Sequence, residues 1–401
     1  MIPKAVYFLV PLLAISLLTI PATAQTDETL YSFTGYADGG DPLSSLVADS
    51  SGNLFGTAFV GGPNGAGEVF ELTRTPSGSW NQSVVYGFTG GADGANPYYA
   101  DVILDAAGNL YGTTVGGGDH NLGVVFKLTR SASGWSESVL HSFAGGSDGA
   151  NPYAGLVFDK AGNLFGTTYG GGSAGIGTIF ELSPGTPGQW TETVLHTFTG
   201  LDGDSPAGGL TLGRNGNLYA VTQGGGAHHS GAVYQLTHST RGWNETVLYS
   251  FTGGADGSSP YAERLLIDNS GHIYGTTEGG GAHQLGAVFR LSLLPSHHWK
   301  EQVLYSFDGS VAANPASGLI ADGAGNLYGT CVNGNGETVG AVYKLLRQPG
   351  DQWTEINLHV FNREDGEFPY ASPIRDAAGN LYGTTLLGGT GSMGVVYRVA
   401  P

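Results

Sequence analysis

The strongest constraint on this chain is an internal repeat. The block Gly-Asn-Leu-Tyr-Gly-Thr recurs with small changes, and its second position is occupied in turn by Asn53, Asn109, Asn163, Asn217, His272, Asn326 and Asn380. Neighbouring copies are therefore 54 to 56 residues apart. Repeats of nearly constant spacing in this range are typical of solenoids and propellers, and they exclude an assembly of unrelated domains.

Each repeat contains four short apolar stretches separated by turn residues. In the third copy these stretches are residues 156–159, 163–168, 178–182 and 192–198, which are rich in β-branched and aromatic side chains. Gly, Pro, Asp and Asn fill the intervals. This pattern predicts four antiparallel strands per repeat, which we number first to fourth in chain order.

Seven such units predict an all-β fold, a seven-bladed β-propeller whose blades are four-stranded antiparallel sheets around a channel. Residues 29–33 read as an isolated fourth strand, and the chain stops just after residues 395–399, which read as a third strand. We therefore expect the ring to close by pairing of the N-terminal strand with the last blade. The alternatives are an array of β-sandwiches or a solenoid, although a solenoid needs capping repeats.

The expected organisation is one propeller over residues 25–401, preceded by a signal peptide over residues 1–24. The blade units are approximately residues 35–89, 90–143, 144–198, 199–251, 252–307 and 308–361, with 362–401 plus 28–34 forming the seventh.

Export is predicted from the N-terminal residues. Lys4 precedes an apolar run over residues 5–20, and Ala22-Thr23-Ala24 is typical of a cleavage site. An uncleaved membrane anchor is the alternative, but a span needs about 20 apolar residues. We therefore expect cleavage near Ala24, a secreted chain (extracellular or periplasmic), and no membrane insertion of the mature chain.

The composition argues against nucleic-acid partners. The formal net charge is −18 at pH 7, and such a chain repels phosphate backbones and anionic membrane surfaces.

Cys331 is the single cysteine, so an internal disulfide is excluded. Most other repeats carry Thr or Ala at its position, which predicts a small buried residue rather than a reactive thiol. A monomer is expected.

Tryptophan occupies one fixed position, at the start of the fourth strand. The residues are Trp80, Trp135, Trp190, Trp243, Trp299 and Trp353. A large aromatic residue at a fixed place in each repeat predicts packing between blades. An exposed platform for stacking sugars is the alternative.

Three recurrent motifs predict turns rather than ligand sites. Asp-x-x-Gly-Asn follows the first strand, and Asp-Gly-x-x-Pro follows the fourth. Each loop supplies a single carboxylate, whereas calcium needs six to eight oxygen ligands. The Gly-Gly-Gly loops between second and third strands lack the helix and lysine of a phosphate-binding loop. No metal and no cofactor is therefore predicted.

The repeat resembles the choice-of-anchor tandem repeat GloVer-containing family of exported bacterial proteins. The resemblance rests on the GNLYGTT block, the GGG loop, the V-[FY]-x-L strand and the VLYSF-x-GG-x-DG-x-x-P segment, and it covers about residues 30–401. It implies a surface or secreted protein and implies no activity. Many relatives end in an anchoring tail, whereas this chain stops after its last strand, so free secretion is the expectation.

Two blades depart from the repeat at the start of the first strand. Ser45, Gly155, Gly209, Gly318 and Ser372 occupy this position in five blades, whereas the second and fifth blades carry Asp101 and Arg264 and one extra residue each. Three blades of seven correspond to roughly 150° around the ring, and first strands line a propeller channel. Asp101 and Arg264 are therefore candidates to face each other at the channel mouth. A rim of solvated charges is the alternative.

The fourth-to-first and second-to-third loops are expected on one face, where binding residues are usually found. Further ligand-binding candidates there are Tyr98, Tyr153, Tyr261, Tyr370, His120, His228 and His283. The alternative for the histidines, which belong to separate blades, is that they are solvated loop residues.

These features predict a secreted binding module for a glycan or a surface-protein ligand. The alternative is an extracellular polysaccharide lyase or hydrolase with its site at the channel mouth, which needs a general acid and a base close together. The weak catalytic candidates are Asp101, Glu263, Glu278 and His283. A purely structural role at the cell surface is a third possibility.

Overall fold

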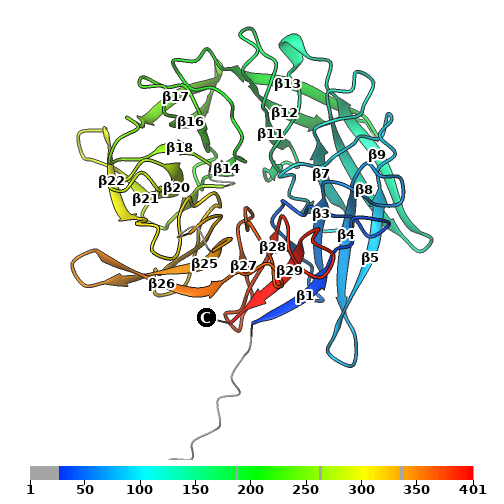
Figure 1. Ribbon diagram of the computed structural model, residues 1–401. Helices are drawn as coiled ribbons and strands as arrows, with labels where there is room; N and C mark the ends of the chain where they lie inside the picture. The colour runs from blue at the N-terminus through cyan, green and yellow to red at the C-terminus, as the bar shows by residue number, and fades with distance from the viewer. Residues whose placement is uncertain (1–26, 187, 262–263, 335–337, 401) are drawn as a thin grey trace, which may run out of the picture.

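The computed structural model describes residues 27–400 apart from 187, 262–263 and 335–337. These residues form seven antiparallel sheets arranged as the blades of a ring (Figure 1). The prediction of a seven-bladed β-propeller is confirmed. The predicted signal peptide and Glu263 lie outside the described residues. No helix in the described ranges is long and apolar enough to cross a membrane.

Within each blade the strands lie side by side, and their order goes from the centre of the ring to its outside (Figure 1). Blade one contains β2 (Val47–Ala48), β3 (Leu54–Ala58), β4 (Glu68–Arg74) and β5 (Trp80–Gly87). Blade two contains β6 (Ile103–Leu104), β7 (Leu110–Thr114), β8 (Val124–Ser131) and β9 (Gly134–Ser142). Blade three contains β10 (Val157–Phe158), β11 (Leu164–Thr168), β12 (Thr178–Pro184) and β13 (Trp190–Thr197), and a 3-10 turn (Gly146–Asp148) precedes it.

Blade four contains β14 (Thr211–Leu212), β15 (Leu218–Thr222), β16 (Ala232–Ser239) and β17 (Gly242–Ser250). Blade five has an additional short strand, so it contains β18 (Ser258–Pro260), β19 (Leu266–Ile267), β20 (Ile273–Gly279), β21 (Ala287–Leu293) and β22 (Trp299–Ser306). Blade six contains β23 (Ile320–Ala321), β24 (Leu327–Cys331), β25 (Ala341–Gln348) and β26 (Gln352–Val360). Blade seven contains β27 (Ile374–Arg375), β28 (Leu381–Thr385), β29 (Val395–Val399) and β1 (Glu28–Ser32).

The ring closes through β1, which is the outermost strand of blade seven. It runs antiparallel to β29, with Thr29 opposite Tyr397 and Ser32 opposite Val395. In Figure 1 the blue N-terminal strand lies directly beside the red C-terminal strand. The predicted closure by the N-terminal strand is confirmed.

Edge-to-face aromatic pairs connect the blades. Within the described residues, the Phe that follows each fourth strand contacts an aromatic ring of the next blade's third strand. The pairs are Phe33–Phe70, Phe88–Phe126, Phe143–Phe180, Phe198–Tyr234, Phe251–Phe289, Phe307–Tyr343 and Phe361–Tyr397, with ring centroids 5.0 to 5.3 Å apart. The pair Phe33–Phe70 joins blade seven to blade one, so the closing interface has the same contact as the other six.

The tryptophans pack between blades, as predicted. Trp135 contacts Phe55 of the preceding blade at 6.2 Å between ring centroids, and Trp243 contacts Phe165 at 5.6 Å. Cys331 is fully buried, which confirms the expectation of a small buried residue, and burial raises the pKa of its thiol.

The recurrent aspartates stabilise turns, as predicted. The Asp105 carboxylate accepts hydrogen bonds from the backbone amides of Ala107 and Asn109, each at 2.9 Å. After the fourth strand of blade one, Asp93 accepts from the Thr89 amide at 2.8 Å and from the Tyr86 hydroxyl at 3.0 Å.

The closing interface is open to a direct test with Phe33→Ala. Phe33 is fully buried, so its truncation should lower the free energy of unfolding by about 3–5 kcal/mol, the usual loss for a buried Phe. Urea denaturation followed by tryptophan fluorescence measures this. The control is Tyr36→Ala, because Tyr36 is 80% exposed and lies only three residues away. Equal effects of the two variants would contradict the proposed closure.

Candidate functional site

The fourth-to-first and second-to-third loops lie side by side on one face of the ring. Isolated β-bridges join them in most blades, for example Ala95 with Gly116 and Ala150 with Gly170. In blade five this contact extends into β18, where Ser258 pairs with Gly279 at the end of β20. We call this side of the propeller the loop face.

The candidate tyrosines of the loop face gather around one further tyrosine, Tyr99. The Tyr99 ring lies 4.6 Å from that of Tyr98, 5.3 Å from that of Tyr261 and 5.9 Å from that of Tyr370. Because blades two and five are three positions apart in the ring, the contact of Tyr99 with Tyr261 spans its centre.

A second group of rings continues from Tyr98. Tyr98 contacts Tyr153 at 5.0 Å, and Tyr153 stacks on Tyr169 at 4.4 Å with an interplanar angle of 14°. We call the whole group the tyrosine cluster: Tyr98, Tyr99, Tyr153, Tyr169, Tyr261 and Tyr370. All except Tyr99 are half-buried, so they present part of each ring at the surface.

Tyr99 was missed by the sequence reasoning. It is 6% exposed, and its φ of +47° places it in the left-handed region, which a bulky side chain rarely adopts. The only sequence signal for it is the extra residue in PYYADVILD. Burial, with a smaller effect of the nearby phenols of Tyr261 and Tyr98, raises the pKa of Tyr99 well above its ordinary value.

Asp101 and Arg264 meet across the channel. Arg264 Nη2 lies 3.8 Å from Asp101 Oδ2 and donates to the Leu156 carbonyl at 3.0 Å, while Asp101 Oδ1 accepts from the Ser45 amide at 2.8 Å. The alternative in the sequence analysis was a rim of solvated charges. Asp101 is instead only 6% exposed, because an arginine and a backbone amide satisfy its carboxylate.

Crowding explains why the neighbouring blades need small residues here. A Cβ added to Gly155 would lie 2.8 Å from the Asp101 Cβ, and one added to Gly318 would lie 2.7 Å from the Arg264 carbonyl oxygen. Asp101 and Arg264 line a 240 Å³ cavity whose apolar wall includes Val47. The ion pair is therefore part of the channel wall.

The remaining candidates are dispersed. Glu278 lies near Tyr261 and Tyr370, and burial raises the pKa of its carboxyl. His120, His228 and His283 are exposed on separate blades. In the described ranges, none of these histidines belongs to a group of three close metal-ligating side chains.

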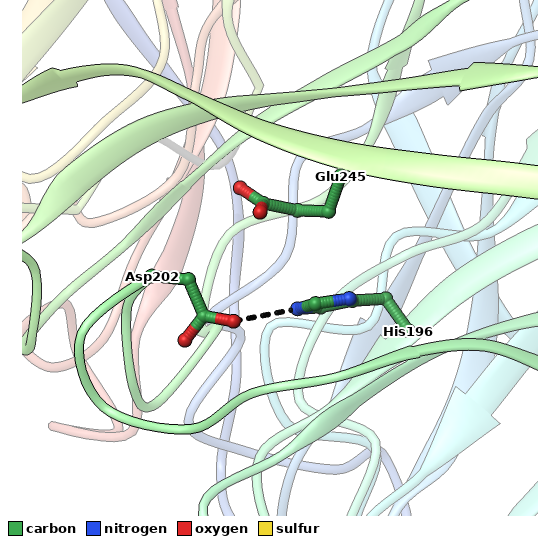
Figure 2. A group of neighbouring side chains, drawn as sticks. All are labelled: His196, Asp202 and Glu245. Carbon is green, nitrogen blue, oxygen red and sulfur yellow. Dashed lines mark hydrogen bonds and ion pairs between the residues drawn. The ribbon is translucent and has the colours of Figure 1, made fainter.

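A polar group that the sequence reasoning missed lies between blades three and four. His196 Nε2 is 2.9 Å from Asp202 Oδ2, and Glu245 of the next blade faces both (Figure 2). One ligand atom from each of these residues lies within 4.8 Å of the others. By this geometry alone the three side chains are suited to hold a metal ion.

The same arrangement recurs with tyrosine in place of histidine. Tyr249 donates to Asp256 at 2.9 Å, and the charges of Asp256 and of Glu301 from the next blade both act on it. Tyrosine and histidine share the ability to hydrogen-bond the loop aspartate, whereas neutral tyrosine is a poor metal ligand. The group therefore serves first as a polar contact between adjacent blades.

Comparison with known proteins places the chain in a family. Residues 16–213, 75–289 and 212–401 each match the Gloeobacter/Verrucomicrobia repeat. The chain belongs to this repeat family. The resemblance inferred from the GNLYGTT block is thereby confirmed. No curated protein matches the sequence.

Solved propellers are similar to this repeat-family member in fold alone. An ancestral GH74 enzyme has 13% identity and a TM-score of 0.56, and the match covers 89% of this chain and 48% of that enzyme. This chain therefore spans about half the length of the GH74 enzyme. A PL25 ulvan lyase bound to -[GlcA(1-4)Rha3S]- has 11% identity and a TM-score of 0.53, with 93% and 95% of the two chains covered. A second structure of a PL25 ulvan lyase has 11% identity and a TM-score of 0.52, with 92% and 95% of the two chains covered.

The glutamates of the interblade contacts in this repeat-family member have shifted pKa values. Burial, and secondarily the loop aspartate of the preceding blade, raises the pKa of each of four carboxyls to about 7: Glu137, Glu192, Glu245 and Glu301. One carboxylate oxygen of each is buried without a hydrogen-bond partner in the described residues. Blade one carries Gln82 at the equivalent position.

These pKa shifts predict a pH dependence of stability. An acid whose pKa is higher in the folded state stabilises fully below its ordinary pKa of 4.5, and this contribution is lost as pH rises to about 7. The melting temperature should therefore fall between pH 4.5 and 7. The variant Glu137→Gln/Glu192→Gln/Glu245→Gln/Glu301→Gln should flatten this slope in differential scanning calorimetry. An unchanged slope would show that other groups control it.

Proposed function

We propose that this chain is an exported carbohydrate-binding protein that holds sugar units on the tyrosine cluster of the loop face. The observation that supports this proposal best is Tyr99. Strained backbone persists only where its surroundings impose it, and such positions concentrate at functional sites. Here the strained residue brings together tyrosines from blades two, five and seven.

The chemistry of the cluster suits a neutral glycan. Aromatic rings pack against the apolar C–H faces of sugars, and phenol hydroxyls hydrogen-bond sugar hydroxyls. The stacked pair Tyr153 and Tyr169 extends this surface beyond the channel mouth. Two propellers of similar fold are named as a polysaccharide lyase and a GH74 enzyme, which is consistent with a glycan ligand.

Exchange of the tyrosines for residues found elsewhere in the repeat tests the proposal. Ala207 and Ala316 occupy, in blades four and six, the position after proline that Tyr153 and Tyr370 occupy. Tyr153→Ala/Tyr370→Ala should therefore fold normally. Its affinity for whichever of cellohexaose, xylohexaose, mannohexaose or laminarihexaose the wild type binds should fall at least about tenfold, or 1.4 kcal/mol, by calorimetry.

Tyr36→Ala is the matched control, because Tyr36 is an exposed tyrosine on the same face outside the cluster. It should bind as wild type does. The proposal fails if the wild type binds none of the four hexasaccharides, or if the double variant retains full affinity with an unchanged melting curve.

Glu278 favours one alternative, an enzyme that cleaves a polysaccharide at the channel mouth. A carboxyl with a raised pKa beside the phenols of Tyr261 and Tyr370 is a candidate general acid. Release of new reducing ends or unsaturated products by the wild type, abolished in Glu278→Gln, would support catalysis. Binding without turnover would favour the non-catalytic function.

A further inference from the structure

A large groove lies between blades three and four on the face opposite the tyrosine cluster. It has a volume of 1090 Å³ and is bounded by the first-to-second turns of both blades, residues 159–163 and 213–217. Trp243, at the hairpin between the third and fourth strands of blade four, forms a further wall. These turns and hairpins leave the ring on the side opposite the loop face. The groove is therefore separate from the proposed sugar site.

The residues of this groove depart from the repeat. Gly213 stands where the other six blades carry the turn aspartate. Its turn is held by Asn215 instead, whose side chain accepts from the Asn217 amide at 3.1 Å and donates to the Tyr219 hydroxyl at 3.1 Å. The consequence is the loss of one negative charge from the groove wall.

Two cations occupy the same position of adjacent turns. Lys160 and Arg214 follow the turn residue in blades three and four, where blades two and seven carry Ala106 and Ala377. Both cationic side chains are exposed. Arg214 donates to the neutral side chain of Asn269 at 2.5 Å, and Lys160 makes no hydrogen bond or ion pair within the described part of the chain.

The two carboxylates of the groove are already engaged. Asp159 accepts from the backbone amides of Ala161 and Asn163 at 2.8 and 2.9 Å, and Glu181 accepts from the Ser183 hydroxyl at 3.0 Å. The protein carries only 15 Lys and Arg against 33 Asp and Glu. In the described residues neither Lys160 nor Arg214 forms an ion pair with an acidic side chain, so both cations of this groove can interact with an anionic ligand.

Trp243 adds an aromatic surface to this charged wall. In blades two and six an arginine side chain lies over the equivalent tryptophan: Arg130 is 5.5 Å from the Trp135 ring and Arg347 is 5.9 Å from the Trp353 ring. Blade four has His238 opposite Trp243 in the strand register, and the His238 ring lies 5.0 Å from the Trp243 ring, so here a histidine replaces the arginine beside the tryptophan. The groove thus combines an aromatic ring, two cations, two carboxylates that are hydrogen-bonded within the protein, and the amides of neighbouring asparagines.

We propose that this groove binds an acidic oligosaccharide. A carboxylate or sulfate group would lie between Lys160 and Arg214, and a sugar ring would pack towards Trp243. The groove differs from the tyrosine cluster in position and in charge, so the two sites take different classes of glycan. The inference does not depend on the proposed function.

Calorimetric titration of the full chain with three probes tests the proposal: tetragalacturonate, a chondroitin sulfate tetrasaccharide and cellotetraose. At least one acidic probe should bind, and raising NaCl from about 20 to 200 mM should weaken it, because salt screens the charge interaction. Lys160→Ala/Arg214→Ala should weaken this binding at least about tenfold, or 1.4 kcal/mol. This double variant should fold normally, because blades two and seven already carry alanine at the equivalent position.

Two control variants distinguish binding in the groove from binding elsewhere on the protein. Arg130→Ala removes one cation from the same face at another interface, and it should leave the affinity unchanged. Tyr153→Ala/Tyr370→Ala should also leave binding of the acidic probe unchanged, whatever it does to neutral sugars. The inference is overturned if neither acidic probe binds, if Arg130→Ala weakens binding as much as the groove variant does, or if the groove variant binds normally.

Discussion

The structure depends on one aromatic contact that is repeated at each interface between blades. A phenylalanine leaving the fourth strand of one blade inserts its edge against a third-strand ring of the next, as Phe88 does with Phe126. A single blade cannot bury this phenylalanine by itself, because the partner ring belongs to its neighbour. Each blade is thus stable only within the ring, as is general for repeat proteins whose units bury a shared core. The loops that carry the candidate sites are held at fixed positions because these contacts fix the blades.

Most of the fold was predictable because the same local signals recur along the chain. The strand pattern occurs in all seven copies, and the turn aspartates such as Asp105 and the tryptophans such as Trp135 each occur in six copies with the same structural role. Closure by β1 was predictable from the missing fourth strand of blade seven. The sites were less accessible because they depend on contacts across the ring. Tyr99 reaches the centre through a backbone conformation that one inserted residue creates. The repeat suggested that Asp101 and Arg264 face each other, but the burial of Asp101 depends on the close approach of the Arg264 side chain and the Ser45 amide, which no local pattern encodes.

The repeats themselves distinguish scaffold from site. His196 and Tyr249 differ in chemistry yet make the same contact with a loop aspartate, which identifies that contact as part of the scaffold. Gly213 is different, because its turn is held by the neutral side chain of Asn215 in place of an aspartate, and one negative charge is lost. The adjacent Arg214 lines the groove and has no aspartate next to it in its own turn. Comparison among blades of one chain therefore supplies part of the information that an alignment of homologues would supply.

The pairing of β1 with β29 also fixes the order in which the molecule can form. β1 is the earliest described strand to be synthesised, and its partner is the last. Closing so long a loop is slow, because contacts between residues distant in sequence form late in folding. Until then the chain is an open arc with two unpaired strand edges, the kind of surface that promotes association between chains. Before β1 pairs with β29, a nascent chain is therefore exposed to aggregation through these edges.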